Sequence, residues 1–503
     1  MTRTLPSPVA AGPDERFGPR LWGLLLVLAG NMLIDALEVS VAVVALPAIG
    51  TDLGAGPTVT QWAMTGFAAG FGGLLLFGAR VVTLLGRRRV YLAALLAFAA
   101  ASVLSALAQD PWLLLTTRLV KGFCAALTAP TGLAIITSTF PEGRPRSRAV
   151  SVYTLFGAGG FTAGLILSGW LTETSWRWAF AFPAPVVLVL FALGLRLIPG
   201  EASGAPKGRG ELRDQPPQRR TRTTTASRYD IPGALTLLAT LLALVQGITQ
   251  IPGHRWSDPR AVGPLCAAAL LLVAFWQIEH RSADPLLRLG PSLRSNPALL
   301  RSAAGAACLN GSYLGLLFVL TYQTQTLAGW SPLRAALALT PAAAPPALTA
   351  LASGRLVVRF GAPRLIVAGA ACAFAGYLLQ LRPDPWPLDY PGRMLPTLLL
   401  VGTGFVLSFA ALNMQAMSRL APADRLTGSG LYQTAVQLAA VVTVALVAAL
   451  LVAYAPAAAP GPAAAAAACR PALTLVAVLG FLGLLVGLTG LIRTPPSSLH
   501  DGE

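Results

Sequence analysis

A series of long apolar stretches constrains this chain more than any other feature. A helix needs about 20 mostly apolar residues to cross a lipid bilayer, and inside lipid a helix satisfies all of its own backbone hydrogen bonds. The chain predicts an all-α membrane protein with fourteen transmembrane helices. Their expected starts are near Leu21, Val59, Val90, Trp112, Ala149, Trp178, Ile231, Ala261, Pro297, Leu333, Pro363, Leu395, Gly430 and Ala472.

Composition supports a membrane protein and argues against a nucleic-acid partner. The chain is 55% hydrophobic and 11% charged, whereas soluble domains carry about 25% charged residues. The formal net charge of +17 does not indicate nucleic-acid binding, because the arginines are spread over short loops and form no single basic patch. The lipid bilayer is the expected surrounding.

The loops predict the orientation of the helices. Arginine-rich loops, such as 87–89 and 144–148, alternate with loops that hold few basic residues. Basic loops face the cytoplasm in membrane proteins. With fourteen spans, the alternation places both termini in the cytoplasm of a protein of the cell membrane.

Loop length and composition also divide the chain. We expect a cytoplasmic tail (1–20), a six-helix bundle (21–199), a basic cytoplasmic linker (200–230), an extra two-helix insert (231–280), a second six-helix bundle (281–495) and a cytoplasmic tail (496–503). The alanine-rich stretch 457–468 is predicted to be an outer loop.

A weak repeat relates the two halves. Residues 79–86 (ARVVTLLG) and 354–361 (GRLVVRFG) are both short turns with glycine and arginine between successive spans. Repeats of this kind occur in transporters built from duplicated bundles. The gating candidates in these turns are Gly86, Arg87, Arg88, Gly354 and Gly361.

Nothing in the sequence points to enzymatic chemistry. No zinc-protease, nucleotide-binding or serine-hydrolase motif occurs, and the five cysteines show no paired spacing. We predict that the protein is not an enzyme and uses neither a cofactor nor a metal.

Two acids stand apart from the others because they fall inside a predicted span. A charge at mid-membrane costs about 2.5–3.5 kcal/mol on insertion scales, so a retained carboxylate suggests a function. Asn31, Asp35 and Glu38 follow one another at four and three residues, which puts them on one helical face. Burial favours the neutral form of a carboxyl group, so either acid could load and release a proton. The alternative is a structural ion pair.

Two bases in the fourth span are the candidate partners of these acids. Arg118 and Lys121 lie three residues apart on one face, and a lysine at membrane depth needs a partner. We expect both bases to face Asp35 and Glu38. Alternatively, Arg118 reaches the membrane interface near Pro111. A permanent pair with Lys121 would make its acid a poor proton carrier, so which acid titrates stays open.

The remaining candidates are small or uncharged residues. Gly157, Gly160 and Gly164 form a small-residue stripe, which favours close helix packing or, alternatively, a sliding surface. Polar side chains in the second half suit either a greasy substrate cavity or contacts between helices. They are Asn310, Tyr313, Gln323, Gln325, Asn413, Gln433 and Gln437.

Several motifs resemble the major facilitator superfamily, and within it the 14-helix drug/proton antiporters of the EmrB/QacA type. The resemblance covers roughly residues 20–495. It is carried by Leu37-Glu38 and the later Val44–Pro47, Gln61-Trp62, Gly86–Arg89, Arg118, Gly122, Ala126, Ser175–Trp178, Gln325, Gly329, Ser331–Leu333 and Pro341. It implies a two-bundle transporter with a midplane cavity, in which Glu38 occupies the position of the family's acid and Gln61 is a further cavity candidate.

The chain also departs from the resembled family. Glu38 stands where the family usually has Asp, and Lys121 where it has Gln. Thr83 occupies the position of the acid in the loop motif that gates these transporters. The fifth-span motif has Leu165 in place of a proline and Ser168 in place of a glycine. The resemblance therefore leaves gating and the direction of transport open.

The expected function is secondary active export of a hydrophobic or cationic small molecule by alternating access, driven by protons that move down their gradient. An importer or uncoupled facilitator of the same fold is one rival. A membrane sensor or scaffold that does not transport is the other, although it would have no reason to keep buried acids.

Overall fold

A computed structural model of the chain describes residues 17–200, 230–253, 258–282, 285–286, 296–349, 353–382, 386–418, 420–421, 424–455 and 461–492. Helices fill these ranges, and no β-strand occurs in them. Most of the predicted linker and both predicted tails lie outside the described residues. The exact domain boundaries therefore stay a prediction.

The first half of the chain forms an N-terminal bundle. Its helices are α1 (Pro19–Asp52), α2 (Pro57–Leu85), α3 (Arg87–Ala106), α4 (Pro111–Thr139), α5 (Arg144–Thr174), α6 (Trp176–Ala181) and α7 (Pro183–Leu197). Proline occupies the first turn of most of them, where its missing N–H leaves no bond unmade. The last two helices follow one another as a single membrane-length segment, Trp176–Leu197.

The second half begins with the insert and continues into a C-terminal bundle. The insert is α9 (Ile231–Gln250), a short η1 turn (Ile251–Gly253) and α10 (Pro259–Arg281). The bundle consists of α12 (Pro297–Thr321), η2 (Tyr322–Leu327), α13 (Pro332–Thr349), α14 (Ser353–Phe360), α15 (Ala362–Gln380), η3 (Tyr390–Met394), α16 (Leu395–Met417), α17 (Arg425–Ala453), α18 (Pro462–Ala468) and α19 (Arg470–Ile492).

A helix lies at each of the fourteen predicted positions. Thirteen helices in the described ranges are long and apolar enough to cross a membrane. The predicted span outside this set is α13, in which Arg334, Pro341, Pro345 and Pro346 interrupt the apolar residues. The all-α membrane fold is confirmed.

The outer-loop prediction for residues 457–468 is wrong in its second part. Pro462–Ala468 forms α18, a helix that leads directly into α19. Alanine has the highest helix propensity of all residues, and a proline at the first position favours helix initiation. A low-complexity composition was mistaken for a loop.

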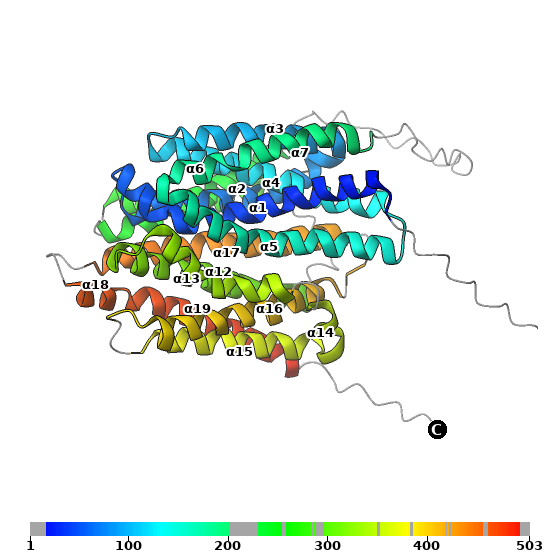
Figure 1. The fold of residues 1–503 in the computed structure, drawn as a ribbon. Coiled ribbons are helices and arrows are strands. Elements are labelled where there is room, and N and C mark those ends of the chain that lie inside the picture. Colours follow the sequence, from blue (N-terminus) through cyan, green and yellow to red (C-terminus); the bar gives the residue numbers. More distant parts are fainter. Residues whose placement is uncertain are drawn as a thin grey trace, which may run out of the picture.

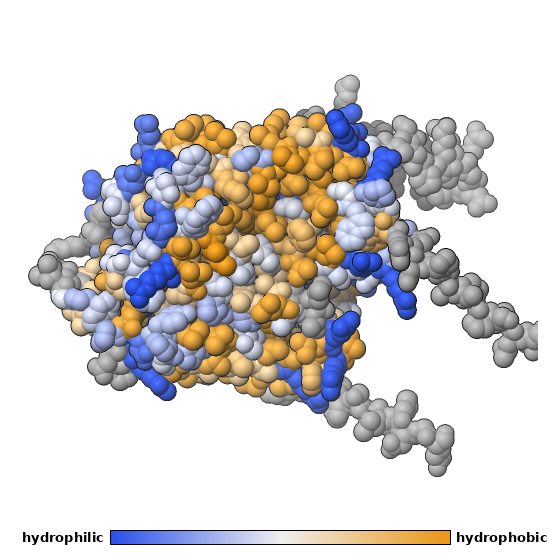
Figure 2. Space-filling view, in the orientation of Figure 1, coloured by the Kyte–Doolittle hydropathy of each residue, from blue (hydrophilic) through white to orange (hydrophobic). Residues whose placement is uncertain are grey.

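The helices run side by side in two groups (Figure 1), with α1 to α7 in the upper half of the view and α12 to α19 in the lower half. The start of α1 and the end of α19 lie at the same end of the molecule. We call this the terminal end and the opposite one the far end. In Figure 2, apolar residues cover the middle and hydrophilic residues gather at both ends, as a bilayer requires.

The two bundles share a core at the far end and have separate cores at the terminal end. One buried cluster joins the far half of α1, from Leu37 to Ile49, to residues of α12, α13 and α17. Buried residues in the terminal half of α1, from Leu24 to Ile34, belong to a cluster formed by helices of the N-terminal bundle. A third cluster, which includes Leu299 and Tyr432, belongs only to the C-terminal bundle.

Hydrogen bonds cross between the bundles along both seams. On the α5–α13 seam, Thr162 donates to the carbonyl of Ala343 over 2.9 Å, and the N–H of Leu333 donates to Glu173 over 2.9 Å at the far end. On the α2–α17 seam, Thr434 donates to the carbonyl of Gly72 over 3.2 Å.

The weak sequence repeat has a counterpart in backbone conformation. Gly86 lies between α2 and α3 with φ 90° and ψ 141°, and Gly361 lies between α14 and α15 with φ 81° and ψ 142°. Side-chain-bearing residues rarely adopt this positive φ. The two glycines therefore make the same sharp turn between successive helices in each half.

Candidate functional site

A fully buried ion triad connects α1 with α4. Glu38, Arg118 and Lys121 each have 0% of their side chain exposed. One carboxylate oxygen of Glu38 pairs with Arg118 and the other with Lys121. The structure places both bases against Glu38, and the fully buried Arg118 does not reach the membrane interface near Pro111.

Backbone carbonyls complete the binding of Arg118. Its Nη2 donates to the carbonyl of Glu38 over 2.9 Å, and its Nε donates to the carbonyl of Ala63 on α2 over 2.6 Å. A buried guanidinium needs acceptors on its fork of donors, and each nitrogen of Arg118 has one. Arg118 thus holds α1, α2 and α4 together.

Aromatic rings enclose the two cations. The Arg118 guanidinium lies 5.0 Å from the ring centroid of Phe67 and 5.5 Å from that of Phe180. The Lys121 ammonium lies 5.1 Å from Phe98 and 5.6 Å from Phe180. These are cation–π distances. The rings come from α2, α3 and α6, so the triad lies in the interior of the N-terminal bundle.

Asp35, one turn from Glu38, has a different environment. Its Oδ2 accepts hydrogen bonds from Asn31 over 3.0 Å and from Thr128 on α4 over 3.1 Å. Among the described residues its Oδ1 has no hydrogen-bond partner, and no cation pairs with it. The expectation that the bases face both acids therefore holds for Glu38 alone.

The charges of the cluster balance only when Asp35 is included. Glu38 carries one negative charge against the two positive charges of Arg118 and Lys121. Ionised Asp35 supplies the second negative charge, and protonated Asp35 leaves one positive charge in a low-dielectric interior. The protonation of Asp35 therefore changes the net charge of the whole buried cluster.

Glycines let α4 approach α2 closely enough for these contacts. A Cβ on Gly122 would lie 2.1 Å from the carbonyl oxygen of Phe67, and one on Gly70 would lie 2.3 Å from that of Leu119. Small residues at such crossings allow backbones to touch. We did not single out Gly70, Thr128 or Phe180 from the sequence, because a glycine, a threonine and a phenylalanine are common in any membrane helix.

The glycine stripe of α5 packs against α1. A Cβ on Gly160 would lie 2.5 Å from the carbonyl oxygen of Leu33, and one on Gly164 would lie 2.1 Å from the hydroxyl of Ser40. Gly157 faces Met32. The stripe therefore supports the helix that carries both acids, and its predicted role in motion stays a prediction.

The polar candidates of the second half lie at several places. Gln325 of η2 donates to the carbonyl of Val44 on α1 over 3.0 Å, so it joins the two bundles. Asn310 donates to the carbonyl of Val436 over 3.2 Å, within the C-terminal bundle. Gln437 packs on Gly72 of α2.

Four further polar candidates are Gln323, Asn413, Gln433 and Gln61. Gln323 is buried in η2, and Asn413 and Gln433 are half-buried on α16 and α17. Gln61 is buried on α2, where its Oε1 accepts from Thr65 over 2.8 Å. Their roles as substrate contacts stay predictions.

An aromatic row crosses from one bundle to the other. Ring centroids lie 5.9 Å apart between Phe161 of α5 and Tyr313 of α12, 4.9 Å between Tyr313 and Phe405 of α16, and 5.0 Å between Phe405 and Phe409. We predicted only Tyr313 from the sequence. The three phenylalanines converge through tertiary packing, which single-helix patterns do not reveal.

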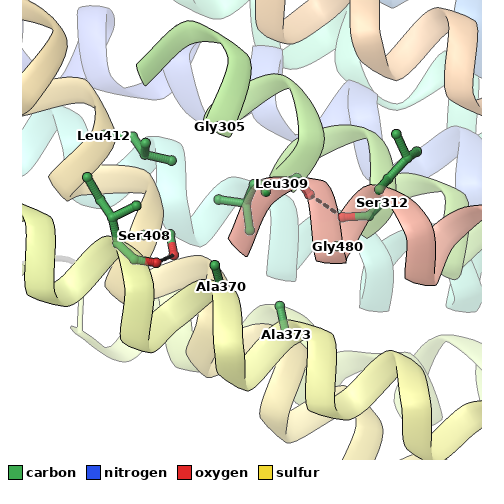
Figure 3. Close-up of a pocket in the computed structure, with 11 residues that line it drawn as sticks. Gly305, Leu309, Ser312, Ala370, Ala373, Ser408, Leu412 and Gly480 are labelled. Carbon is green, nitrogen blue, oxygen red and sulfur yellow. Dashed lines mark hydrogen bonds between the residues drawn. The ribbon is translucent and has the colours of Figure 1, made fainter. Parts of the chain in front are cut away.

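In the described part of the C-terminal bundle, no charged side chain is fully buried. A cavity of about 20 Å³ lies between α12, α15, α16 and α19, beside Leu309, Ser312 and Ser408 (Figure 3). Its volume suffices for about one water molecule. Tyr377 donates to Ser312 over 2.9 Å, and Ser312 donates to the carbonyl of Cys308 over 2.7 Å.

Three of the gating candidates, Gly86, Arg87 and Arg88, lie at the terminal end, where α2 ends and α3 begins. Arg88 donates to the carbonyl of Leu195 over 2.7 Å, and Arg87 donates to the carbonyl of Ala134 over 3.5 Å. Thr83, at the position of the family's loop acid, donates to the carbonyl of Arg80 in its own helix over 2.7 Å. Gly354 lies within α14.

Membrane-spanning helices in two bundles related by a repeat are the architecture of many secondary transporters. A solved peptide transporter POT in complex with sulfate has the same fold, with a TM-score of 0.65, 14% identity and 95% of each chain covered. The profile of the Major Facilitator Superfamily matches residues 28–444.

Curated relatives agree with this class. The puromycin resistance protein pur8 of Streptomyces alboniger is 34% identical over 88% of this chain and 83% of its own length. The cephamycin export protein CmcT of Amycolatopsis lactamdurans is 31% identical over 84% of this chain and 83% of its own length. The chain belongs to the major facilitator superfamily and is a multi-pass membrane transporter, not an enzyme.

Proposed function

We propose that this protein exports hydrophobic small molecules, cationic ones included, in exchange for protons. The observation that carries the proposal is the contrast between the two buried acids. Glu38 pairs with two basic side chains, whereas Asp35 has only neutral hydrogen-bond donors among the described residues. The names of the relatives, which refer to resistance and export, support the outward direction.

Asp35 is the proposed proton carrier. Glu38 pairs with both Arg118 and Lys121, and loss of these pairs would leave buried charges without a partner. Asp35 can take a proton on Oδ1, which has no partner among the described residues. Glu38, which occupies the position of the family's acid, then keeps the cluster together and fixes α1 against α4.

We propose that the terminal end faces the cytoplasm of a cell-membrane protein. The arginine-rich turns, including Arg87 and Arg88, lie at this end, and basic loops favour the cytoplasmic side. The shared core at the far end and the separate cores at the terminal end then correspond to a conformation that opens inward. Rocking of the bundles would expose the substrate path alternately.

Uncharged aromatic residues between the bundles support the proposal of a hydrophobic substrate. The aromatic row from Phe161 to Phe409 joins both bundles, so a molecule between the bundles would contact aromatic faces. Most drug-sized ligands bind in sites lined by apolar and aromatic side chains with a few polar groups. Gln325 and Asn310 are candidates for such polar groups.

Transport in everted membrane vesicles tests the proposal. With an acidic lumen, the native protein should accumulate labelled puromycin or ethidium, and Asp35→Asn should reduce gradient-driven accumulation at least tenfold, the factor that corresponds to about 1.4 kcal/mol. Glu142→Gln is a matched control, because Glu142 forms an exposed pair with Arg146.

Two results would contradict the mechanism. Undiminished gradient-driven accumulation by Asp35→Asn, at equal protein levels, would remove Asp35 as the carrier. Transport that equilibrates without any pH gradient, in the native protein as well, would identify an uncoupled facilitator.

A further inference from the structure

At the terminal end, three separate parts of the chain meet in one polar junction. They are the end of α2, the two ends of the α9–α10 insert, and the segment Pro285–Leu286 that leads toward α12. Neither the buried ion triad nor the proposed substrate path includes these residues.

The insert holds Leu286 through a shared hydrogen bond. The N–H of Leu286 lies 3.1 Å from Oδ2 of Asp230, before α9, and 3.2 Å from Oε1 of Glu279, in the last turns of α10. Both acids are at least nine-tenths buried, as is Leu286. One backbone donor thus brings together two carboxylates from the two ends of the insert.

Arg80 connects this arrangement to the N-terminal bundle. Its Nη2 donates to the carbonyl of Pro285, the residue before Leu286, over 2.7 Å. The guanidinium of α2 and the two carboxylates of the insert therefore bind successive peptide groups. The donor and the two acceptors thus hold both sides of the Pro285–Leu286 segment.

The backbone conformation of Asp230 lets its carboxylate make two contacts at the junction. Asp230 adopts φ 46°, a left-handed conformation that is unusual for a residue with a side chain. In this conformation its Oδ1 accepts from the N–H of Gly233 and caps α9, while its Oδ2 stays available for Leu286. One carboxylate thereby starts the insert and binds the segment that follows it.

The insert also covers the α2–α17 seam between the bundles. Val245 and Ile248 of α9 share a buried cluster with Trp62 and Ala69 of α2 and with Val441 of α17. Because α9 touches both bundles and its starting residue binds Leu286, the insert is placed to sense their relative movement.

We propose that Arg80, Asp230 and Glu279 form a latch that stabilises the conformation of this structure, in which the cores of the two bundles are separate at the terminal end. The latch ties the N-terminal bundle to the segment entering the C-terminal bundle. It takes the place of the family's loop acid, since Thr83 at that position bonds only within its own helix. Its role in transport rests on the proposed function, but its effect on conformation is measurable without transport.

Distance measurements between spin labels test the latch. Labels at Leu84→Cys in α2 and Val358→Cys in α14 report on the two bundles, because both native side chains are exposed. Cys266, Cys308 and Cys372 are replaced first, since they are exposed or half-buried. In the native background, the distances should include a long population for the separated state. Arg80→Ala should lower the ratio of long to short distances about tenfold, as expected for loss of a hydrogen bond to a charged group in one state only.

Conservative variants separate the latch from a merely structural role. Asp230→Asn keeps one side-chain acceptor and should shift the ratio less than Asp230→Ala. Arg80→Lys keeps a charged donor and should partly restore the native ratio, and it also serves if Arg80→Ala fails to fold. Glu142→Gln, which breaks an exposed pair, should leave both the distances and the unfolding temperature unchanged.

An unchanged ratio in Arg80→Ala and Asp230→Ala, or a shift toward longer distances, would overturn the latch. Either result is compatible with a working exporter. Conversely, absence of substrate accumulation in the native protein would overturn the proposed function, while the distance shift would still report on the latch.

Discussion

The interiors of the two bundles differ in charge, although both halves have similar turns between their helices. Both halves turn between successive helices at a glycine of nearly the same conformation, Gly86 and Gly361. The interior of the N-terminal bundle holds three fully buried ions, whereas that of the C-terminal bundle holds a Tyr377–Ser312 hydrogen bond and a cavity of about 20 Å³. The repeat therefore preserves the helical scaffold, and the chemistry of each interior is independent of it.

This difference assigns separate tasks to the bundles. Buried ions tolerate the loss of a partner poorly, so the N-terminal interior holds its triad in one arrangement, and in the proposed mechanism Asp35 is the group that changes its charge. Neutral hydrogen bonds and small cavities cost little to rearrange, so the C-terminal bundle can present an adaptable apolar wall. Three substitutions test how far the contrast extends.

The largest effect is expected from Arg118→Met. It removes one cation and leaves Glu38 with only Lys121, and breaking a buried ion pair costs about 3–5 kcal/mol. We expect a markedly lower unfolding temperature in detergent, measured by thermal unfolding. The triple variant E38L/R118M/K121M removes every charge of the triad, so it should regain stability while transport stays lost. A triple variant no more stable than R118M would contradict the argument that unpaired charge is the cause.

A smaller effect is expected from Gly122→Ala. Its Cβ would lie 2.1 Å from the carbonyl oxygen of Phe67, so α4 must move away from α2. Overpacking of this kind costs about 1–3 kcal/mol, and it should also weaken the bond from Arg118 to Ala63. Gly159→Ala, where a Cβ would meet nothing within 4 Å, is the matched control. Equal unfolding temperatures for both variants would refute the close approach of α2 and α4.

The smallest effect is expected in the C-terminal bundle. Tyr377→Phe removes the hydrogen bond to Ser312, which contributes about 1 kcal/mol. Ser312 keeps its own bonds to the carbonyls of Cys308 and Leu309, so no new unpaired group is buried. We expect a shift of a few degrees in the unfolding temperature and unchanged vesicle transport. A loss of transport as large as that in Asp35→Asn would show that the two interiors are not functionally different.

Much of the fold and part of the site were predictable. The long apolar stretches correctly predicted a helix at each expected position, because a bilayer admits few backbone structures other than a helix. The spacing of Asp35 and Glu38 predicted one shared face, and the position of Lys121 inside a predicted span predicted a buried partner. The prediction failed at Pro462–Ala468, where composition indicated a loop although alanine is the strongest helix former.

The sequence by itself determined the membrane helices, the duplicated turns and the presence of two acids and two bases in α1 and α4. These follow from local properties: apolar length, helical period, and the cost of charge in lipid. Only the tertiary structure decided that both bases bind Glu38 and that Asn31 and Thr128 bind Asp35. That choice depends on how closely α4 approaches α1 and α2, which glycines on neighbouring helices set and which no single helix encodes.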